Sequence, residues 1–577
     1  MPDENLSYPA LFLKKRIWTM EKSDIVIIGG VACGCKAAAT LARRNPNLRI
    51  TLFQKEDDLS YATCGLPYFA SGDVDSFRAL TETSYNVVRD VEYFRKSKGF
   101  NAVTESEVIE INRIEKKVKV KDLKTGDSYD HGYDKLVIST GATPMKLPID
   151  IPKTDRIMPF TRPEDARNFR KLAQTGEIGS ALVVGGGFIG CEMAEATASL
   201  WGIETTLVEM ENQLLPYALD EDMAIPVAKE MEANDIKFHL NTAVTEFELD
   251  DDKVKVKLSN DEQLQVDYVF LCVGVNPASH LAEAAGLELG ESGGIKVNEY
   301  MQTSDPDIYA GGDVVESIHQ ITGKPIYLPL GSIANRHGRI IADHIAGGDE
   351  KFPGVLGAFM IKVFDLNAGS VGLNQRAADE AGINANSVWA SFVDKPDYYP
   401  ESKPISLKMV FNPEDRSLLG IQAVGKGDVV RRIDVFSAFL QNKARIDDLL
   451  DFEHGYAPPY AEALDPLYQL GAIAKSLEHG FEQENPGNDY SRGDFILLDV
   501  REPEEVEALP FKAENAIHIP LNDLVDNIEK LDKSKKIVIL CHRGMRSYQA
   551  SHILKTAGFE HISYIAGGTT LAVKSLA

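Results

Sequence analysis

The sequence predicts an α/β protein of several domains, and three observations support this fold class. Two segments, starting near residues 24 and 181, each follow a short apolar strand with a glycine-rich turn and a helix. A third strand-and-helix pattern starts near residue 495, after a polar stretch that contains Pro and Gly. A chain of 577 residues also exceeds a single hydrophobic core, so we expect roughly three or four domains.

The first unit has the pattern of a dinucleotide-binding strand, turn, helix and strand. DIVIIGG predicts a buried strand, VACGCKAAATLARR a closely packed helix, and RITLF the second strand. Gly29 and Gly34 hold the first and third glycine positions, whereas Val31 takes the second. Gln54 replaces the acid that usually closes the second strand, and its side chain can still bond a ribose hydroxyl. The predicted nucleotide contacts are Gly29, Gly30, Gly34 and Gln54.

The second unit carries the complete glycine fingerprint. ALVVGGGFIG places Gly185, Gly187 and Gly190 in the full pattern, and Glu209 closes the next strand nineteen residues after Gly190. These glycines let a pyrophosphate approach the helix N-terminus, and a carboxylate on the ribose hydroxyls disfavours a 2′-phosphate. We therefore expect NADH in preference to NADPH. A glycine-rich turn without a ligand is the alternative.

Two dinucleotide units call for two nucleotides, and a nicotinamide beside a flavin is the usual chemical reason. Three further motifs follow: LVISTGATP, YVFLCVGVNP and TSDPDIYAGGDV. Together with the two turns they resemble the two-dinucleotide flavoprotein disulfide reductases over residues 24–470. The resemblance implies two Rossmann-like domains, with Asp313 on the ribityl chain of FAD. It also places Gly141, Gly274 and Gly312 among the cofactor contacts.

Cys64, in SYATCGLPYF, lacks the second cysteine of the dithiol members, because the next five residues contain no thiol. It must then act alone, as a sulfenate or as a mixed disulfide with a small thiol. The segment resembles the single-cysteine branch, above all the coenzyme A disulfide reductases. NADH oxidases and peroxidases are the competing branch, and a small buried hydrophobe is the purely structural alternative.

This resemblance implies further residues around Cys64. Arg43 lies on the family's coenzyme A path, although a solvated helix C-terminus explains an arginine there nearly as well. Ser60 and Thr63 are expected to orient the bound thiol. Tyr456 and Tyr460, in HGYAPPYAEALDP, are expected to reach the partner subunit's cysteine as proton donors, with core packing open for one of them.

Cys541 follows the apolar strand KIVIL and opens the loop CHRGMRS before a helix. Backbone N–H groups can converge on its sulfur there, and Arg543 and Arg546 add positive charge that favours a thiolate or persulfide. The loop, with Asp499 and Arg501 in LDVREPEE, resembles the rhodanese family. An inactive rhodanese fold used only for docking is the alternative.

These patterns predict the following division of the chain. Residues 21–140 and 270–345 form the FAD-binding domain, 141–269 the NAD-binding domain, 346–475 an α+β dimerisation domain, 476–490 a linker and 491–577 the rhodanese domain. Residues 1–20 are either a disordered extension or sequence upstream of a true start at Met20. The family resemblance implies a homodimer.

Composition narrows the possible partners. Lys and Arg number 61 against 87 Asp and Glu, and the formal net charge of −26 argues against nucleic acid and anionic lipid surfaces. We find no secretory signal pattern and no apolar run near the roughly 20 residues of a membrane span, so the cytoplasm is expected. The six cysteines do not suggest a disulfide framework. Cys33 and Cys35 are predicted to pack in the glycine-rich turn and not to bind a metal.

The two cysteine motifs together predict a reductase of sulfane sulfur. We expect NADH to reduce FAD and FAD to reduce Cys64, which cleaves coenzyme A persulfide or a polysulfide to hydrosulfide and thiol. Cys541 would supply the sulfur atom, as in fused coenzyme A disulfide reductase and rhodanese proteins. The rivals are a coenzyme A disulfide reductase or NADH peroxidase, and a sulfurtransferase that delivers sulfur to a protein.

Overall fold

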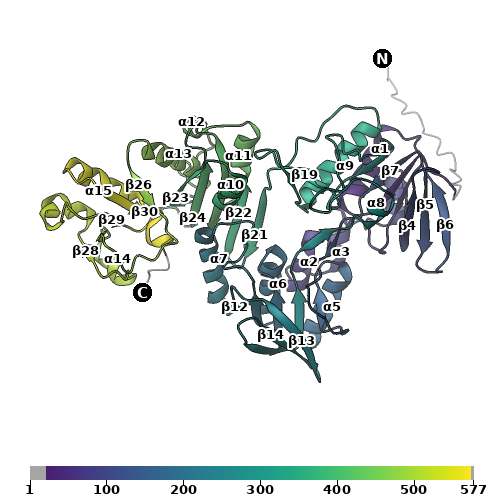
Figure 1. Cartoon of the computed structure of the whole chain (residues 1–577), viewed down its shortest axis with the longest axis horizontal. Coiled ribbons are helices and arrows are strands. Elements are labelled where there is room, and N and C mark those ends of the chain that lie inside the picture. The colour runs from purple at the N-terminus through teal and green to yellow at the C-terminus, as the bar shows by residue number, and fades with distance from the viewer. Residues whose placement is uncertain (1–20, 573–577) are drawn as a thin grey trace, which may run out of the picture.

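The computed structural model describes residues 21–572, and the predicted leader with its alternative start at Met20 lies outside the described residues. Figure 1 shows the N-terminal domain at one end of the molecule and the C-terminal domain at the other. The five-stranded sheet of the β21–β25 region lies between them, and a second dinucleotide-type domain lies beneath. Within residues 21–572 no helix is both long and apolar enough to cross a membrane.

The first sheet is parallel and contains strands from two distant parts of the chain. Its order is β18 (Ile308–Ala310), β7 (Lys135–Ile138), β1 (Ile25–Ile28), β2 (Ile50–Phe53) and β3 (Asn101–Val103). The apolar β1 and β2 are buried along their whole length, as expected for a sheet covered on both faces. Helix α1 (Ala32–Arg44) packs beside α9 (Gly331–Ile345). Short α3 (Phe77–Thr81), α4 (Val91–Tyr93) and α8 (His280–Ala284) and the β19 (Ser317–Ile318) and β20 (Pro325–Ile326) pair complete this part.

The second sheet repeats this arrangement. Its order is β12 (Lys237–His239), β11 (Glu204–Val208), β10 (Ser180–Val184), β16 (Tyr268–Leu271) and β9 (Ile157–Pro159), with helices α5 (Pro163–Thr175), α6 (Phe188–Ala198) and α7 (Glu221–Ala233). Each unit also has a three-stranded antiparallel sheet. These are β4 (Ser106–Asn112), β5 (Lys117–Asp122) and β6 (Ser128–Gly132), and β13 (Val244–Asp250), β14 (Lys253–Leu258) and β15 (Gln263–Val266). The chain passes between the units through β8 (Ala142–Pro144) and β17 (Val275–Pro277), which pair antiparallel.

The third sheet is antiparallel and backed by helices, as expected for an α+β domain. Its order is β21 (Phe359–Val363), β22 (Leu366–Gly372), β25 (Leu418–Gly425), β24 (Pro404–Phe411) and β23 (Asn386–Val393). The helices are α10 (Gln375–Ala381), α11 (Val430–Gln441), α12 (Ile446–Leu450) and α13 (Pro466–Leu477). Asp220 and the buried Asp222 of the second unit lie 2.8 and 3.0 Å from Lys408 Nζ on β24. This cluster fixes the third domain against the second.

The C-terminal sheet is parallel, with helices α14 (Pro503–Ala508) and α15 (Met545–Thr556). Its order is β26 (Glu482–Glu484), β30 (Ile562–Ile565), β29 (Ile537–Leu540), β27 (Ile496–Asp499) and β28 (Ala516–His518). The prediction that 476–490 is a linker is therefore wrong in part, because β26 pairs with β30. Glu484 anchors this strand, since its carboxylate accepts from Lys536 Nζ at 2.5 Å and Ser563 Oγ at 2.6 Å.

Candidate active sites

Both glycine-rich turns hold a backbone N–H against the side chain that closes the second strand. Gly30 N donates to Gln54 Oε1 at 2.6 Å, and Gly186 N donates to Glu209 Oε2 at 2.5 Å. Gln54 thus makes in the first unit the turn contact that Glu209 makes in the second. The first unit departs from the fingerprint in residue type but keeps this hydrogen bond.

The glycines at these turns are required by close backbone approach. A Cβ at Gly34 would lie 1.9 Å from Gly29 O, and one at Gly190 would lie 1.8 Å from Gly185 O. Gly187, the residue before α6, instead faces open space at the helix N-terminus. A phosphate group fits such a position, because the free N–H groups of the first helical turn point toward it. The turns therefore fit dinucleotides.

The other predicted cofactor residues lie at strand ends of the two units. Gly141 follows β7 and Gly274 follows β16, both with positive φ, so each bends the chain into its crossover strand. Gly312 also has a positive φ, of 81°, and turns the chain after β18 toward Asp313. Burial raises the pKa of the Asp313 carboxyl to about 6. A half-buried carboxyl of this kind fits a hydroxyl-rich ligand, which can donate hydrogen bonds to it.

Cys64 lies at the junction of the two dinucleotide units. It belongs to a short 3₁₀ turn, Thr63–Gly65, directly before α2 (Leu66–Ser71), and its side chain is exposed. Helix α2 packs on α5 and α6 of the second unit (Figure 1), with Leu66 and Phe69 in that unit's core. Trp201 Nε1 also donates to Ala70 O at 2.8 Å. The thiol is thereby held between the two candidate nucleotide sites.

The charge around Cys64 disfavours its thiolate in the isolated chain. Although the residue is exposed, neighbouring protein atoms partly desolvate its sulfur, which raises the pKa of Cys64, and the carboxylates of Glu192 and Asp313 raise it further. A nucleophilic thiol needs the opposite effect, from a cation, a hydrogen-bond donor or a helix N-terminus. The groups that activate Cys64 are therefore expected from a bound cofactor or a second subunit.

Glu192 and Tyr68 are two neighbours of Cys64 that the sequence did not single out. Burial raises the pKa of Glu192 to about 7, with Glu195 adding to the shift. Burial and Glu192 raise the pKa of Tyr68 to about 12. Glu192 follows the second glycine fingerprint on α6, whereas Tyr68 follows Cys64 on α2. Only the packing of α2 on α6 brings them together.

The residues around the predicted coenzyme A path differ in exposure and in the bonds that they already make within the chain. Arg44 pairs with Asp343 at 2.5 Å, whereas the exposed Arg43 makes one long hydrogen bond, at 3.4 Å, to Thr40 Oγ1. Ser60 adopts a positive φ of 48° and donates its N–H to Gly30 O at 2.8 Å. Thr63 is exposed beside Cys64. Arg43 is therefore the arginine available for a ligand.

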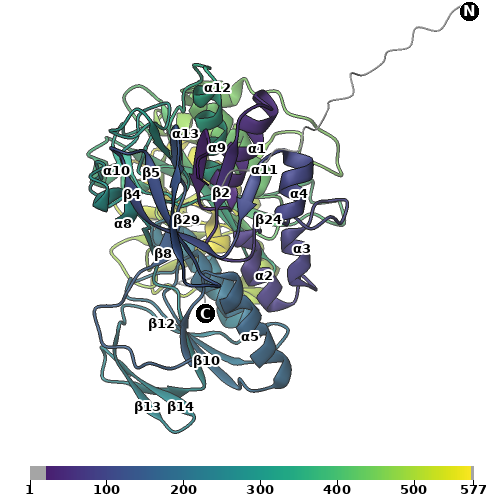
Figure 2. The same ribbon diagram turned by 90° about the vertical axis from the view of Figure 1, so that its right-hand side faces the viewer.

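Tyr456 and Tyr460 lie between α12 and α13 with exposed fractions of 52% and 69%. Figures 1 and 2 both place α12 well away from α2, which follows Cys64. Neither ring packs in the core of its own chain, although the side chain of Tyr456 hydrogen-bonds with that of Tyr398. Both rings are exposed enough to contact another molecule. Their action on Cys64 within one chain is not supported by this arrangement.

Cys541 lies in a loop built to hold an anion. Its side chain is buried, and Gly544 N donates to its Sγ at 3.0 Å directly before α15. Thr569 N donates to Cys541 O at 3.0 Å, and a Cβ at Gly568 would lie 2.3 Å from that oxygen. The loop therefore depends on a glycine for its shape. A thiolate or persulfide is stabilised by such N–H donors at a helix N-terminus.

The two arginines of this loop are both paired with carboxylates. Arg546 makes two bonds of 2.6 Å to Glu505, which lowers the pKa of that carboxyl to about 2. Arg543 bonds to Asp397 of the third domain, with N···O distances of 3.1 Å. Their charge is thus partly neutralised, and the hydrogen-bond donor that contacts Cys541 Sγ is the Gly544 N–H.

The remaining four cysteines are buried thiols. Burial raises the pKa of Cys35 to about 12, and it also raises the pKa of Cys33, Cys191 and Cys272. Cys35 Sγ donates to Gly30 O at 3.1 Å within the glycine-rich turn. Within the described residues no three His, Cys, Asp or Glu side chains cluster as a metal site.

The fold and the two thiol loops define a reductase with two dinucleotide-binding domains and a C-terminal sulfurtransferase-type domain. Residues 23–324 match the family described as pyridine nucleotide-disulphide oxidoreductase, and 359–468 match its dimerisation domain. Residues 486–573 match the rhodanese-like domain. The chain belongs to the pyridine nucleotide-disulphide oxidoreductase family and carries a C-terminal rhodanese-like domain. This confirms the predicted family and fold class.

Three relatives illustrate the range of that family. The chain is 35% identical to an NADH oxidase of Methanocaldococcus jannaschii over 77% of its length and 96% of the relative's. It is 31% identical to the NAD(P)H coenzyme A polysulfide/persulfide reductase of Pyrococcus horikoshii, over 79% and 99%. The solved NAD-dependent persulfide reductase from A. fulgidus is 39% identical, with a TM-score of 0.91 over 95% of this chain and 99% of that one.

Proposed function

We propose that the chain is an NADH-oxidising, FAD-dependent reductase of coenzyme A persulfide or polysulfide that releases hydrosulfide. The observation that carries the proposal is the pair of thiols. An exposed, unpartnered Cys64 lies between two dinucleotide domains, and a buried Cys541 lies under backbone N–H donors in the same chain. The names of the Pyrococcus and A. fulgidus relatives support the same chemistry.

The two glycine-rich turns divide the nucleotides between them. The Gly29 to Gly34 turn, with Asp313, would hold FAD, and the Gly185 to Gly190 turn, with Glu209, would hold NADH. A flavin supplies the transfer of reducing equivalents from a nicotinamide to a sulfur centre. The Glu209 carboxylate favours NADH, because it repels a 2′-phosphate.

Cys64 would perform the sulfur step as a nucleophile. Its thiolate attacks the sulfur that is bonded to coenzyme A in the persulfide, a Cys64–S–S–CoA bond forms, and the terminal sulfur leaves as hydrosulfide. Two electrons and a proton then restore the Cys64 thiolate and free coenzyme A. Arg43 would bind a phosphate of coenzyme A, with Ser60 and Thr63 beside the thiol.

A homodimer would complete this site. The match to a dimerisation domain and the exposure of the Tyr456 and Tyr460 side chains support it. A phenol within reach of Cys64 would donate a proton or hydrogen bond to the departing thiolate. That donor would also offset the carboxylates that raise the pKa of Cys64.

Cys541 would deliver the sulfane sulfur. Its thiolate takes a sulfur atom from polysulfide, thiosulfate or elemental sulfur and passes it on as a persulfide. A rhodanese domain serves this purpose in a persulfide reductase, whereas reduction of plain coenzyme A disulfide gives it no evident role.

A second candidate is an NADH oxidase or peroxidase, favoured by the exposed Cys64 and the name of the Methanocaldococcus relative. NADH consumption with polysulfide plus coenzyme A, with coenzyme A disulfide and with peroxide, measured beside hydrosulfide release, separates the candidates. We expect the highest kcat/KM with the persulfide, and one hydrosulfide for each NADH. A preference for peroxide without hydrosulfide would overturn the proposal.

A further inference from the structure

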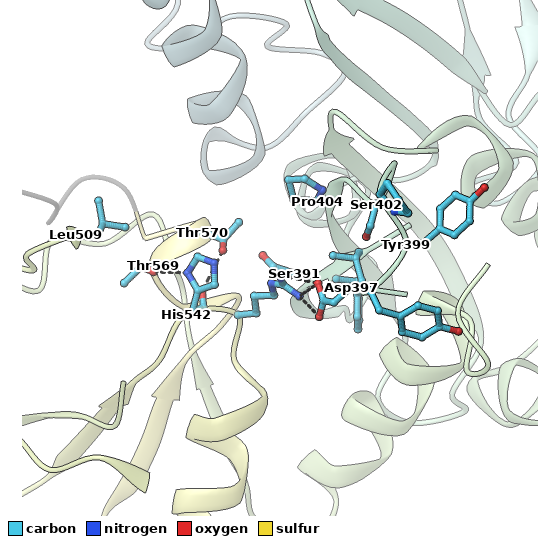
Figure 3. A pocket seen from close by; sticks show the side chains of 14 residues that line it. Ser391, Asp397, Tyr399, Ser402, Pro404, Leu509, His542, Thr569 and Thr570 are labelled. Carbon is cyan, nitrogen blue, oxygen red and sulfur yellow. Dashed lines mark hydrogen bonds and ion pairs between the residues drawn. The ribbon is translucent and has the colours of Figure 1, made fainter. Parts of the chain in front are cut away.

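A cavity of about 440 Å³ lies between the Cys541 loop and the third domain (Figure 3). On one side it is lined by His542, Arg543 and Thr569, and on the other by Ser391, Asp397 and Tyr399. The first of these two sides is part of the Cys541 loop. Thr569 N donates to Cys541 O, and Thr569 Oγ1 lies 3.1 Å from His542 Nδ1. A small donor approaching the loop from this cavity meets both domains.

Arg543 is the positively charged side chain of the cavity lining, and it pairs with a carboxylate of the third domain. Arg543 NH1 lies 3.1 Å from both oxygens of Asp397, and Arg543 NH2 lies 3.1 Å from Oδ1. The Asp397 side chain is 68% exposed and the Arg543 side chain 34%, so the pair lies at an open mouth and not in a core. A surface pair of this kind adds little to stability.

The other residues that line the cavity include no Lys and no second Arg. Burial, followed by the charge of Arg543, lowers the pKa of His542, which favours its neutral form. The rest of the lining consists of serine and threonine hydroxyls, Tyr398 and Tyr399, and apolar side chains. The electrostatic attraction of the mouth for an anion therefore depends on whether Arg543 is free or covered by Asp397.

We infer that Asp397 is a specificity-determining residue for sulfur donation to Cys541, selecting against compact dianions such as thiosulfate. This rests on the proposed sulfur-delivery role of Cys541. With its charge covered, Arg543 attracts a dianion weakly, whereas the approach of an uncharged sulfane donor, such as elemental sulfur or an organic trisulfide, does not depend on that charge. The third domain thereby sets the donor preference of the rhodanese-like domain.

The affected step is a sulfur transfer. The Cys541 thiolate attacks the outer sulfur of thiosulfate, the S–S bond breaks, and sulfite leaves with the electron pair, so Cys541 becomes a persulfide. Cyanide then takes the outer sulfur as thiocyanate and regenerates the thiolate. No electrons are exchanged with a cofactor, so the step can be measured in a Cys64→Ser background.

The test compares Asp397→Asn, Arg543→Gln and the double variant in full-length Cys64→Ser protein, by thiocyanate formation from thiosulfate and cyanide. We expect Asp397→Asn to raise kcat/KM for thiosulfate about fivefold, with a steeper decline as salt is added. The gain should vanish when Arg543 is Gln. Glu401→Gln is the matched control, because Glu401 is an exposed carboxylate of the same loop outside the cavity lining.

A neutral organic trisulfide serves as the second donor and separates charge from structure. With the trisulfide, Asp397→Asn should leave kcat/KM equal to that of the Cys64→Ser parent. A loosened contact between the two domains would instead change kcat/KM for both donors. An unchanged or lower thiosulfate kcat/KM in Asp397→Asn, or a gain that persists in the double variant, would overturn the inference. The Cys64→Ser background keeps this outcome independent of the proposed NADH-linked reduction.

Discussion

Cys64 and Cys541 are both candidate sulfur nucleophiles, but their surroundings are opposite. Cys541 is buried in a loop of one domain, with a backbone donor 3.0 Å from its sulfur at a helix N-terminus. Cys64 is exposed between two domains, and its own chain raises its pKa through partial desolvation of the sulfur and two nearby carboxylates. The backbone donor to the Cys541 sulfur comes from its own domain, whereas under the proposed function a cofactor and a partner subunit complete the Cys64 site.

The largest expected effect separates the two thiols. Cys64→Ser should lower NADH-dependent hydrosulfide release by more than about a thousandfold, because a hydroxyl cannot form the mixed disulfide. Cys541→Ser should retain NADH-dependent reduction of coenzyme A disulfide while losing thiosulfate sulfurtransferase activity. Steady-state rates of both reactions check this. If either variant lost the NADH-dependent activity and the thiosulfate sulfurtransferase activity to the same extent, the two sites would not act separately.

The dependence of Cys64 on a second subunit gives the next effect. Tyr456→Phe should lower kcat roughly tenfold, because a general acid to the leaving thiolate is lost. An equimolar mixture of Cys64→Ser and Tyr456→Phe chains should regain about a quarter of wild-type activity if the tyrosine acts across the interface. This estimate assumes that random pairing leaves half the dimers mixed, each with one intact site. No recovery on mixing would place the tyrosine within its own chain.

Arg43 and Arg44 test whether the Cys64 side of the molecule binds a phosphorylated thiol. Arg43→Gln should raise KM for coenzyme A disulfide roughly fivefold, since one charge-assisted phosphate contact is removed. Arg44→Gln is the control, because its guanidinium already pairs with Asp343. Initial rates over substrate concentration distinguish them. A larger rise in KM for Arg44→Gln than for Arg43→Gln would show that Arg44, and not Arg43, contacts the phosphate.

The smallest effect concerns the Glu505–Arg546 pair beside the Cys541 loop. Glu505 has a pKa of about 2, lowered chiefly by its bond with Arg546. A depressed carboxyl pKa stabilises the fold above the unfolded value, and this contribution is lost as pH falls toward the folded value. Glu505→Gln should therefore cost roughly 1 kcal/mol at pH 7, after allowance for its partial exposure. The difference from wild type should shrink between about pH 4.5 and 2 in thermal unfolding.

The sequence predicted what depends on short segments. The glycine turns, the missing second thiol after Cys64 and the CHRGMRS loop are local patterns with a chemical meaning. Contacts between residues far apart in the sequence leave no local sequence pattern and could not be predicted. Glu192 lies beside Cys64 only because α2 packs on α6, and Asp397 meets Arg543 across 146 positions of sequence. Strand β26 escaped prediction because its short, polar segment gains its partners only from the C-terminal sheet.

The central claim is that Cys64 forms a mixed disulfide with coenzyme A and that NADH resolves it. The most direct measurement treats Cys541→Ser protein with coenzyme A persulfide before NADH is added, followed by peptide mass spectrometry and hydrosulfide assay. We predict coenzyme A on the Cys64 peptide, one hydrosulfide released per site, and loss of the adduct after NADH. An unmodified Cys64, or an adduct that NADH leaves in place, would contradict the claim.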